Sequence, residues 1–240
     1  MNWLSMARLE RELFHKVKRA NLKYQMIGNG DRVALGLSGG KDSLALLHAL
    51  IQLRRYTPLQ FDIIAITVDL GFGSDHSGLE QHCRELNVPL IVEPTNIGRI
   101  VFEERKENSP CSLCSNLRKG ALHRVALAEN CNKVALAHHL DDAVVTFFMS
   151  MAYEGQARCF KPSSFLDRTG LTLVRPLVYV PENLIIRLCK KLNLPVESNP
   201  CPAAGQTKRA LIQKWLAVLD NHHPQAKLHF LTAIEKLYWQ

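Results

Sequence analysis

The sequence has no apolar run long enough to cross a membrane. Nowhere in the 240 residues does such a run approach the roughly 18 residues that a transmembrane helix requires. The first 20 residues are charged and lack the apolar core and the cleavage site of a signal peptide. Internal repeats, low-complexity tracts and an obvious interdomain linker are also absent. These absences predict a globular, cytoplasmic chain without membrane contact.

Acidic residues are scarce relative to basic ones. The chain has 22 Asp and Glu against 30 Lys and Arg, which gives a formal net charge of +8. This excess favours a polyanionic partner. The remaining composition, with 47% hydrophobic and 22% charged residues, is ordinary for a soluble globular enzyme of one large domain with a small appendage.

Short Val-, Ile- and Leu-rich runs alternate with longer segments of helical period. We expect strands over 32–37, 61–69, 88–92, 133–137 and 172–176, and helices over 43–54, 78–86, 112–129, 141–153 and 182–192. The alternation predicts an α/β fold with a mostly parallel five-stranded sheet flanked by helices. In such sheets, ligands bind beyond the carboxyl ends of the strands.

Both ends of the chain differ from this middle part. Residues 1–23 predict an amphipathic helix with Leu4, Leu9, Leu13 and Val17 on its apolar face. Its basic face either is solvated while the helix packs on the sheet or contacts RNA. From 206 onward we expect helices with a buried stripe of Trp215, Leu216 and Leu219. We therefore divide the chain into an N-terminal basic helix (1–30), a nucleotide-binding domain (31–200) and a helical extension (201–240).

The most informative segment is a glycine-containing loop at a predicted strand-to-helix junction. It consists of Ser38, Gly39, Gly40, Lys41, Asp42 and Ser43. The two glycines allow close main-chain approach to a ligand, and the helix N-terminus favours phosphate. The simpler alternative is a Gly-Gly turn with a helix cap. Neither GxxxxGK[ST] nor GxGxxG is present, so the segment is not a Walker loop or a dinucleotide fingerprint.

Carboxylates follow two other predicted strands. Asp69 ends the second strand, and the sequence His138-His139-Leu140-Asp141-Asp142 follows the fourth. Carboxylates at these positions can hold Mg²⁺ against phosphate oxygens. One of the two consecutive aspartates is expected to cap the following helix. For the histidine pair we favour substrate or phosphate contacts over metal binding.

The 7 cysteines form no plausible disulfide framework in a cytoplasmic chain. Cys111 and Cys114 make a CxxC at a predicted helix start, which is compatible with zinc, iron–sulfur or redox chemistry, and a second CxxC is missing. Cys201 lies between two prolines. Three thiolates without a fourth protein ligand fit a [4Fe–4S] cluster with one open iron. We expect packing roles for the remaining cysteines, Cys83, Cys131, Cys159 and Cys189.

Together these motifs resemble the TtcA family of tRNA 2-thiocytidine synthetases, within the PP-loop ATP pyrophosphatases. The resemblance rests on SGGKDS, PCSLCSNLRKG, AHHLDDAVVTFFMSMAYEG, LVRPLVYVPE and a late Pro-Cys, in the family's order. It implies a PP-loop fold and thiolation of cytidine 32 in the tRNA anticodon loop. ATP would adenylate O2 of the cytosine, and sulfur on the open iron of the cluster would attack C2.

The resemblance also implies roles for individual residues. Lys41, Asp42 and Asp142 would be catalytic, and the ATP-binding residues would be Ser38, Gly39, Gly40, Lys41, Asp42, Ser43, Asp69 and His138. Cys111, Cys114 and Cys201 would hold the [4Fe–4S] cluster, and Arg118, Lys119 and Arg124 would contact RNA. The expected cofactors and partners are ATP, Mg²⁺, tRNA, a cysteine desulfurase or other sulfur donor, and a second copy of the chain.

Two departures from the family keep other interpretations open. Ala204 stands where relatives often have a second late cysteine, and Thr207-Lys208-Arg209 is distinctive enough to mark a subgroup with another substrate. One alternative is an adenylating enzyme such as a lysidine-type ligase or a small-molecule thiolating enzyme, although the cysteines argue against an amine nucleophile. The other is a non-catalytic iron–sulfur or zinc redox module, against which the intact loop argues.

Overall fold

A computed structural model of the chain describes residues 7–105, 110–197, 201 and 208–239. Its strands are β1 (Arg32–Gly36), β2 (Asp62–Asp69), β3 (Leu90–Pro94), β4 (Lys133–Ala135), β5 (Ser163–Leu166) and β6 (Leu171–Val174). Its helices are α1 (Arg8–Tyr24), α2 (Lys41–Tyr56), α3 (Ser77–Glu85), α4 (Ile97–Arg99), α5 (Pro110–Ala128), α6 (Leu140–Glu154), α7 (Glu182–Lys191), α8 (Lys208–His222) and α9 (Ala226–Tyr238), with the π-helix η2 (Ile100–Glu104). Among these described helices, none is both long and apolar enough to span a membrane.

The six strands form one sheet in the order β3-β2-β1-β4-β6-β5. Neighbouring strands from β3 to β6 run parallel, and β5 runs antiparallel to β6. The α/β class and the mostly parallel sheet are confirmed, but the prediction of five strands is wrong because it omits β5. This strand has only four residues, and Phe165 within it is exposed. Pairing with β6, rather than an apolar pattern of its own, stabilises it.

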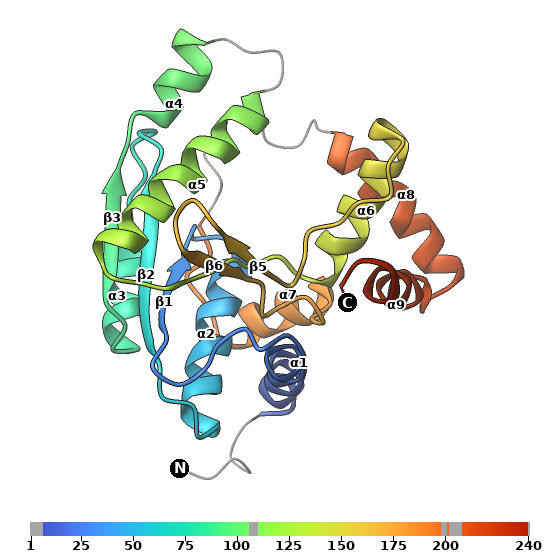
Figure 1. Cartoon of the computed structure of the whole chain (residues 1–240), viewed down its shortest axis with the longest axis horizontal. Helices are drawn as coiled ribbons and strands as arrows, with labels where there is room; N and C mark the ends of the chain where they lie inside the picture. The colour runs from blue at the N-terminus through green and yellow to red at the C-terminus, as the bar shows by residue number, and fades with distance from the viewer. Residues whose placement is uncertain (1–6, 106–109, 198–200, 202–207, 240) are drawn as a thin grey trace.

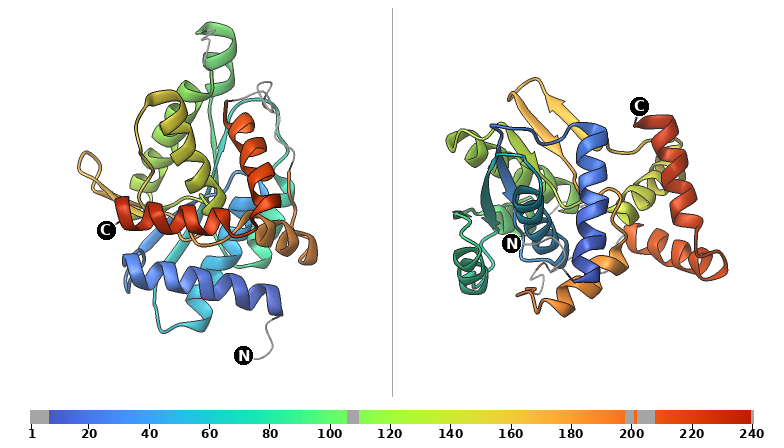
Figure 2. Two further views of the ribbon diagram at one scale, coloured as in Figure 1. Left: turned by 90° about the vertical axis from the view of Figure 1, so that its right-hand side faces the viewer. Right: turned by 90° about the horizontal axis from the view of Figure 1, so that it is seen from below.

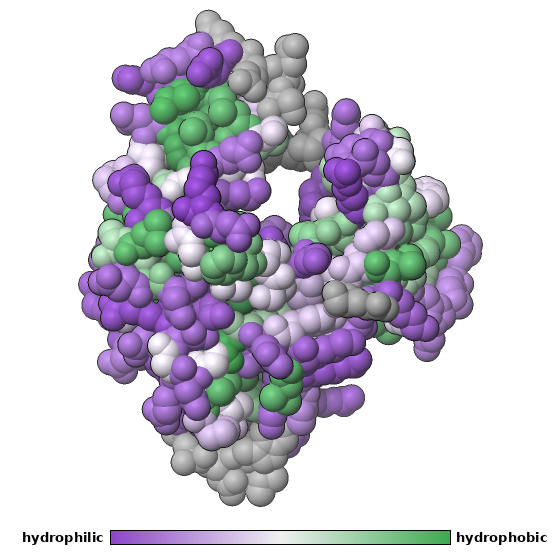
Figure 3. Space-filling view, in the orientation of Figure 1, coloured by the Kyte–Doolittle hydropathy of each residue, from purple (hydrophilic) through white to green (hydrophobic). Residues whose placement is uncertain are grey.

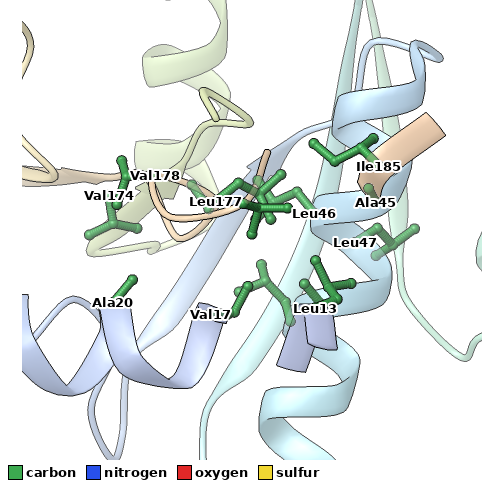
Figure 4. Packing of buried hydrophobic residues seen from close by; sticks show 14 of the residues in the cluster. Leu13, Val17, Ala20, Ala45, Leu46, Leu47, Val174, Leu177, Val178 and Ile185 are labelled. Atoms are coloured by element: carbon green, nitrogen blue, oxygen red, sulfur yellow. The ribbon is translucent and has the colours of Figure 1, made fainter. Parts of the chain in front are cut away.

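Helices cover both faces of the sheet. Side chains alternate between the faces along a strand, so Val33 and Leu35 of β1 join a large cluster with α1, α2 and α7, whereas Ala34 joins a smaller cluster with α5. Figure 4 shows part of the large cluster, where Leu13 and Val17 of α1 lie close to α2. The two layers of helices hold the strand ends in fixed positions, and those strand ends carry the candidate site.

The predicted N-terminal helix is confirmed as α1, which packs against α2 and α7. Its apolar stripe is buried at Leu13 and Val17, while Leu4 lies outside the described residues. Part of its basic face forms an intramolecular ion pair, because Lys23 pairs with Glu235 of α9. This ion pair links α1 to α9, the helix that runs next to it in the left view of Figure 2. The structure thus supports the packing alternative for part of this face.

The C-terminal helices α8 and α9 pack against α6. Leu216 is buried and Leu219 is half-buried, but Trp215 is 54% exposed, so its prediction as a core residue is wrong. The buried residues of α8 are Ile212 and Leu216, one helical turn apart, and Trp215 falls beside this stripe. Its ring packs edge-on against Phe148 of α6, with ring centroids 5.4 Å apart.

Candidate functional site

The candidate site lies at the carboxyl ends of β1, β2 and β4. The strand order reverses at β1, because β2 and β3 follow on one side and β4 lies on the other. Such a switch point is where open α/β sheets bind ligands. Helices α5 and α6 stand on opposite sides of this sheet edge in Figure 1, and the surface between them is hollowed in Figure 3. The topology therefore places the predicted motifs around one depression.

The predicted phosphate loop forms a tight turn between β1 and α2. Gly39 has a φ of 75°, a value that favours glycine, and Gly40 is the N-cap of α2. The main-chain N–H of Ser38 donates to Ser43 Oγ (3.1 Å), and the Ser43 hydroxyl donates to the Gly40 carbonyl (2.9 Å). The Ser43 hydroxyl, expected to contact phosphate, therefore closes the loop. The first amides of α2 lack partners within the helix and suit an anion.

Two cavities meet at this loop. The first has a volume of about 480 Å³, and Asp69 and Arg118 belong to its lining. The second, of about 330 Å³, reaches from the loop to α5 and α6. Residues shared by both linings are Ser38, Gly40, Val68 and Arg118. Polar residues that line the second cavity alone are Asp42, Ser43, Ser115, Lys119, His138 and Asp142. The loop is thus the common wall of both cavities.

A buried histidine gathers three carboxylates beside the loop. His139 is 4% exposed, and its Nε2 lies 3.6 Å from Asp42 Oδ1 and 3.5 Å from Asp142 Oδ2. Its Nδ1 lies 3.7 Å from Asp141 Oδ2. Asp142 Oδ2 also accepts the main-chain N–H of His139 (3.0 Å), so this aspartate caps α6 as expected for one of the pair. His139, rather than His138, joins the phosphate loop to α6.

Each of the three carboxylates has a basic partner. The pairs are Asp42 with Lys41 (2.9 Å), Asp141 with Lys227 (2.9 Å) and Asp142 with Arg209. Lys227 and Arg209 come from α9 and α8, so the helical extension neutralises charge beside the loop. Arg209 belongs to the distinctive tripeptide noted in the sequence, and Thr207 of that tripeptide lies outside the described residues.

His138 borders the second cavity as a neutral group. Its ring packs on Phe160, with centroids 4.9 Å apart. Burial, reinforced by the positive charge of Arg175, lowers the pKa of His138 to about 4. Within the described residues its buried Nδ1 has no hydrogen-bond partner. A neutral imidazole offers one donor and one acceptor, which suits a substrate contact at neutral pH.

Of the three predicted cluster cysteines, Cys114 interacts electrostatically with the other two. Cys111 is exposed at the start of α5, Cys114 is buried one turn later, and Cys201 is half-buried. Burial raises the pKa of Cys114, Arg118 opposes this shift, and electrostatic interaction with Cys201 and Cys111 adds to it. Cys201 thus comes close to the CxxC although 87 positions separate it from Cys114.

The donor set at this site consists of three thiolates, each of which would bind a different iron of a [4Fe–4S] cluster. In the described part of the chain, no three His, Cys, Asp or Glu side chains are grouped closely enough to hold one metal ion. Soft thiolate ligands also suit iron–sulfur chemistry. The donor set therefore fits a cluster with three protein ligands.

The other four cysteines are in settings that disfavour thiolate chemistry. Burial raises the pKa of Cys83 to about 11 and of Cys159 to about 12. Burial also raises the pKa values of Cys131 and Cys189. These buried settings fit the expected packing roles. Burial raises the pKa of Cys114 in the same direction, so Cys114 differs from these four in its interaction with Cys111 and Cys201.

The three predicted RNA-contacting residues divide into two groups. Arg118 and Lys119 line the second cavity on the exposed side of α5. Arg124, two turns further along the helix, is exposed and pairs with Glu93 of β3 at 2.7 Å. The structure thus brings Arg118 and Lys119 to the site and leaves Arg124 outside the two linings.

Sequence reasoning missed two acidic residues that contact the loop. Glu182, the first residue of α7, lies 2.9 Å from Lys41 Nζ through Oε1. The main-chain N–H of Glu197 donates to the Gly39 carbonyl (3.0 Å), and its side chain would overlap a Cβ placed on Gly39. Neither residue is near the loop in sequence, so no local pattern could indicate these contacts.

Comparison with known proteins gives consistent matches. The PP-loop domain family matches residues 10–218. The tRNA-cytidine(32) 2-sulfurtransferase of Citrifermentans bemidjiense is 36% identical over 241 residues, covering 97% of this chain and 94% of that protein. The enzyme of the same name from Geotalea uraniireducens is 37% identical over 237 residues, with coverages of 95% and 94%.

A similar solved structure is the U34-tRNA thiolase NcsA from Methanococcus maripaludis with its [4Fe–4S] cluster. It aligns with a TM-score of 0.78 and 25% identity, covering 95% of this chain and 78% of that one. NMN synthetase from Francisella tularensis aligns with a TM-score of 0.51 at 18% identity, a likeness of fold alone. The architecture seen here is therefore shared with proteins that have different substrates.

Proposed function

Because this chain belongs to the PP-loop family and, within it, to the tRNA-cytidine(32) 2-sulfurtransferases, we propose that it thiolates cytidine 32 of tRNA at the expense of ATP. One observation carries the proposal. The second cavity has the phosphate loop on one side and, on the other, three α5 residues that follow Cys114: Ser115 directly after it, and Arg118 and Lys119 about one turn further on. A base in this cavity lies between the group that activates it and the group that supplies sulfur.

ATP binds at the phosphate loop. Main-chain amides at the start of α2 and the Ser38 hydroxyl hold phosphate oxygens, while Asp69 borders the first cavity, where the nucleoside fits. His138 contacts the substrate at the wall of the second cavity. Lys41 contributes the positive charge of the loop. The larger volume of the first cavity supports this division between the nucleoside and the tRNA base.

Asp42 and Asp142 are proposed to hold Mg²⁺. Their carboxylates both approach His139 Nε2, so they face the same point from α2 and α6. Mg²⁺ is commonly bound by one or two carboxylates together with substrate phosphates. In this site it would neutralise charge that develops at the α-phosphorus.

The reaction then follows in two steps, adenylation of the base and replacement of AMP by sulfur. The cytosine O2 attacks the α-phosphorus of ATP, and pyrophosphate leaves. Sulfide attacks C2, and AMP departs with the former O2. Electrostatic stabilisation by the loop amides is the largest contribution expected of this chain. Adenylation is needed because an amide-like oxygen is otherwise a very poor leaving group.

Cys111, Cys114 and Cys201 would hold the [4Fe–4S] cluster, which when bound supplies an open iron that can carry sulfur. The electrostatic interaction of Cys114 with both Cys111 and Cys201 supports this assignment. A lysidine-type ligase, which uses an amine nucleophile, would have no use for such a group. A redox module without catalysis would not need the phosphate loop.

The remaining partners follow from this reaction. Arg118 and Lys119 contact tRNA phosphates near the cavity, and Arg124 contributes less because it is paired with Glu93. A cysteine desulfurase or other donor supplies sulfur, and the enzyme acts in the cytoplasm as a homodimer. We retain the division into residues 1–30, 31–200 and 201–240 as part of the proposal.

The function is tested by anaerobic incubation of the cluster-loaded enzyme with tRNA, Mg²⁺-ATP and sulfide. We expect AMP and 2-thiocytidine to form in parallel, with both products absent when ATP is omitted. AMP without a thiolated nucleoside would favour another adenylating activity. A visible iron–sulfur spectrum without AMP formation would favour a redox module.

A further inference from the structure

The ammonium group of Lys41 points to a role that the loop sequence does not reveal. In the described loop, Ser38, Gly40, Asp42 and Ser43 line a cavity, whereas Lys41 lines neither of the two. Its Nζ lies instead 2.9 Å from both carboxylate oxygens of Asp42 and 2.9 Å from Glu182 Oε1. The only lysine of the loop is therefore paired with two carboxylates, of which Asp42 lines the second cavity, and its own side chain lines neither cavity.

The main chain of Glu182 is anchored beside the loop. It is the first residue of α7, and its main-chain N–H donates to Asp141 Oδ2 (2.7 Å). Further along α7, Cys189 Sγ lies 3.4 Å from the Lys41 carbonyl oxygen. Helix α7 therefore contacts the start of α2 at two points, one at the main chain and one at the ammonium group.

Lys41 forms ion pairs with both Asp42 and Glu182. Two carboxylates around one ammonium leave a net negative charge. That charge is suited to a metal ion beside Asp42 and unsuited to direct phosphate binding by Lys41.

We propose that Glu182 is a positioning residue, which holds Lys41 as a brace on Asp42 so that the Asp42 carboxylate faces the second cavity. Of these three ion-paired residues, only Asp42 lines the second cavity. Lys41 pairs with Asp42, and Glu182 pairs with Lys41. The inference rests on the proposed function, because Asp42 is assigned there to the metal and the phosphates. In this proposal Lys41 does not bind phosphate but holds the Asp42 carboxylate in place.

The test compares Glu182→Gln, Lys41→Met and the double variant in the complete, cluster-loaded enzyme. With tRNA and sulfide present, kcat and KM for ATP are measured from AMP formation. We expect kcat to fall by about 100-fold in each single variant, since a small misplacement at a reacting centre costs about that much. The KM for ATP should stay within about 3-fold, because no direct phosphate contact is removed.

Coupling between the two residues gives a readout that a purely structural defect would not reproduce. Because both act through Asp42, the double variant should be no worse than either single variant. Glu182→Asp, which keeps the charge, should recover part of the lost kcat. Glu80→Gln is the matched control, because Glu80 is an exposed acidic residue in the first turn of α3. The melting temperature and the cluster spectrum show whether each variant is folded.

Two results would overturn the proposal. If Lys41→Met raised the KM for ATP with little change in kcat, Lys41 would be a phosphate ligand. If Glu182→Gln left kcat unchanged or improved ATP affinity, Glu182 would not be a positioning residue. Failure of the proposed function is distinguishable, because the wild-type enzyme itself would then form no AMP.

Discussion

The phosphate loop and the cysteine site are built in opposite ways. The loop is a continuous segment, closed by hydrogen bonds from Ser38 to Ser43 and from Ser43 to Gly40. The cysteine site joins the first turn of α5 to Cys201, which lies far away in the sequence. Among the described residues, no three potential ligands are grouped closely enough to hold one metal ion. The loop thus holds its shape through its own contacts, whereas the proposed cysteine site joins segments that are distant in the sequence.

The largest effect should follow from breaking the cysteine site. Serine at Cys111, Cys114 or Cys201 should abolish the visible iron–sulfur absorption and 2-thiocytidine formation, because each thiolate binds a separate iron. ATP binding should survive, since the loop is formed independently. Absorption spectra and tRNA nucleoside analysis measure the first two properties, and nucleotide binding measures the third.

The four buried cysteines serve as controls for this prediction. Serine at Cys83, Cys131, Cys159 or Cys189 should keep the cluster and cost about 1–2 kcal/mol in the free energy of unfolding, because a hydroxyl is buried in an apolar setting. A full cluster in Cys201→Ser would refute the three-ligand arrangement. Cys189 or Cys159 would then become the candidate third ligand.

The phosphate loop can be broken by one methyl group. Gly39→Ala combines a positive φ with overlap between the new Cβ and Glu197. AMP formation should fall by about 100-fold or more, because misplaced loop amides no longer stabilise the α-phosphorus, while the cluster spectrum remains. Gly170→Ala is a matched control, since Gly170 has a φ of 69° but open space around its Cβ position and lies outside both cavities. Equal losses in both variants would show that backbone strain alone is responsible.

Charge reversal on α5 tests which part of the depression contacts tRNA. Arg118→Glu combined with Lys119→Glu should weaken tRNA binding by about 10-fold or more and reduce the salt dependence by about two charges. Arg124→Glu should have a smaller effect, because Arg124 pairs with Glu93 outside the two cavities. Titrations at several salt concentrations measure both quantities. Equal effects at the two positions would place the tRNA along the whole helix.

The smallest effect concerns stability at low pH. The pKa of His138 is lowered in the folded protein to about 4 from its ordinary value of 6.5, so the unfolded chain binds a proton more readily between these values. Its contribution to stability is present above pH 6.5 and is lost as the pH falls towards 4. Urea unfolding gives the free energy of unfolding at pH 7 and at pH 5. The loss in this free energy between the two pH values should be about 2 kcal/mol smaller in His138→Gln than in the wild type.

His123→Gln provides the comparison on the cysteine-bearing helix. Burial also lowers the pKa of His123, and Lys119 and Arg168 add to the shift. The same direction of pH dependence is expected there, with a smaller change than at His138. A larger pH dependence of the free energy of unfolding from His123 than from His138 would contradict this expectation.

The contrast between the two regions also explains what could be predicted from the sequence. The loop was found because its residues are contiguous and lie at a strand-to-helix junction, and the mostly parallel sheet was the expected one. Asp69 and Asp142 were assigned by their positions after strands, and both line the cavities. These features depend on local patterns and on the topology of parallel sheets.

The features that were missed arise from contacts between distant segments. Glu182 and Glu197 reach the loop only through the packing of the chain after β6. The strand β5 is too short to show a period, and Trp215 lies beside a buried stripe rather than within it. Helical period indicates which face is apolar but does not specify which of two adjacent residues the tertiary packing buries.

The most direct test of the account is mass-spectrometric analysis of nucleosides from tRNA treated with the cluster-loaded enzyme, Mg²⁺-ATP and sulfide. The account predicts 2-thiocytidine at position 32, formed in the wild type and absent in both Cys201→Ser and Gly39→Ala. It also predicts that Gly39→Ala retains the iron–sulfur spectrum while Cys201→Ser retains ATP binding. Unmodified cytidine 32 after wild-type treatment, with AMP formed and the cluster intact, would contradict it.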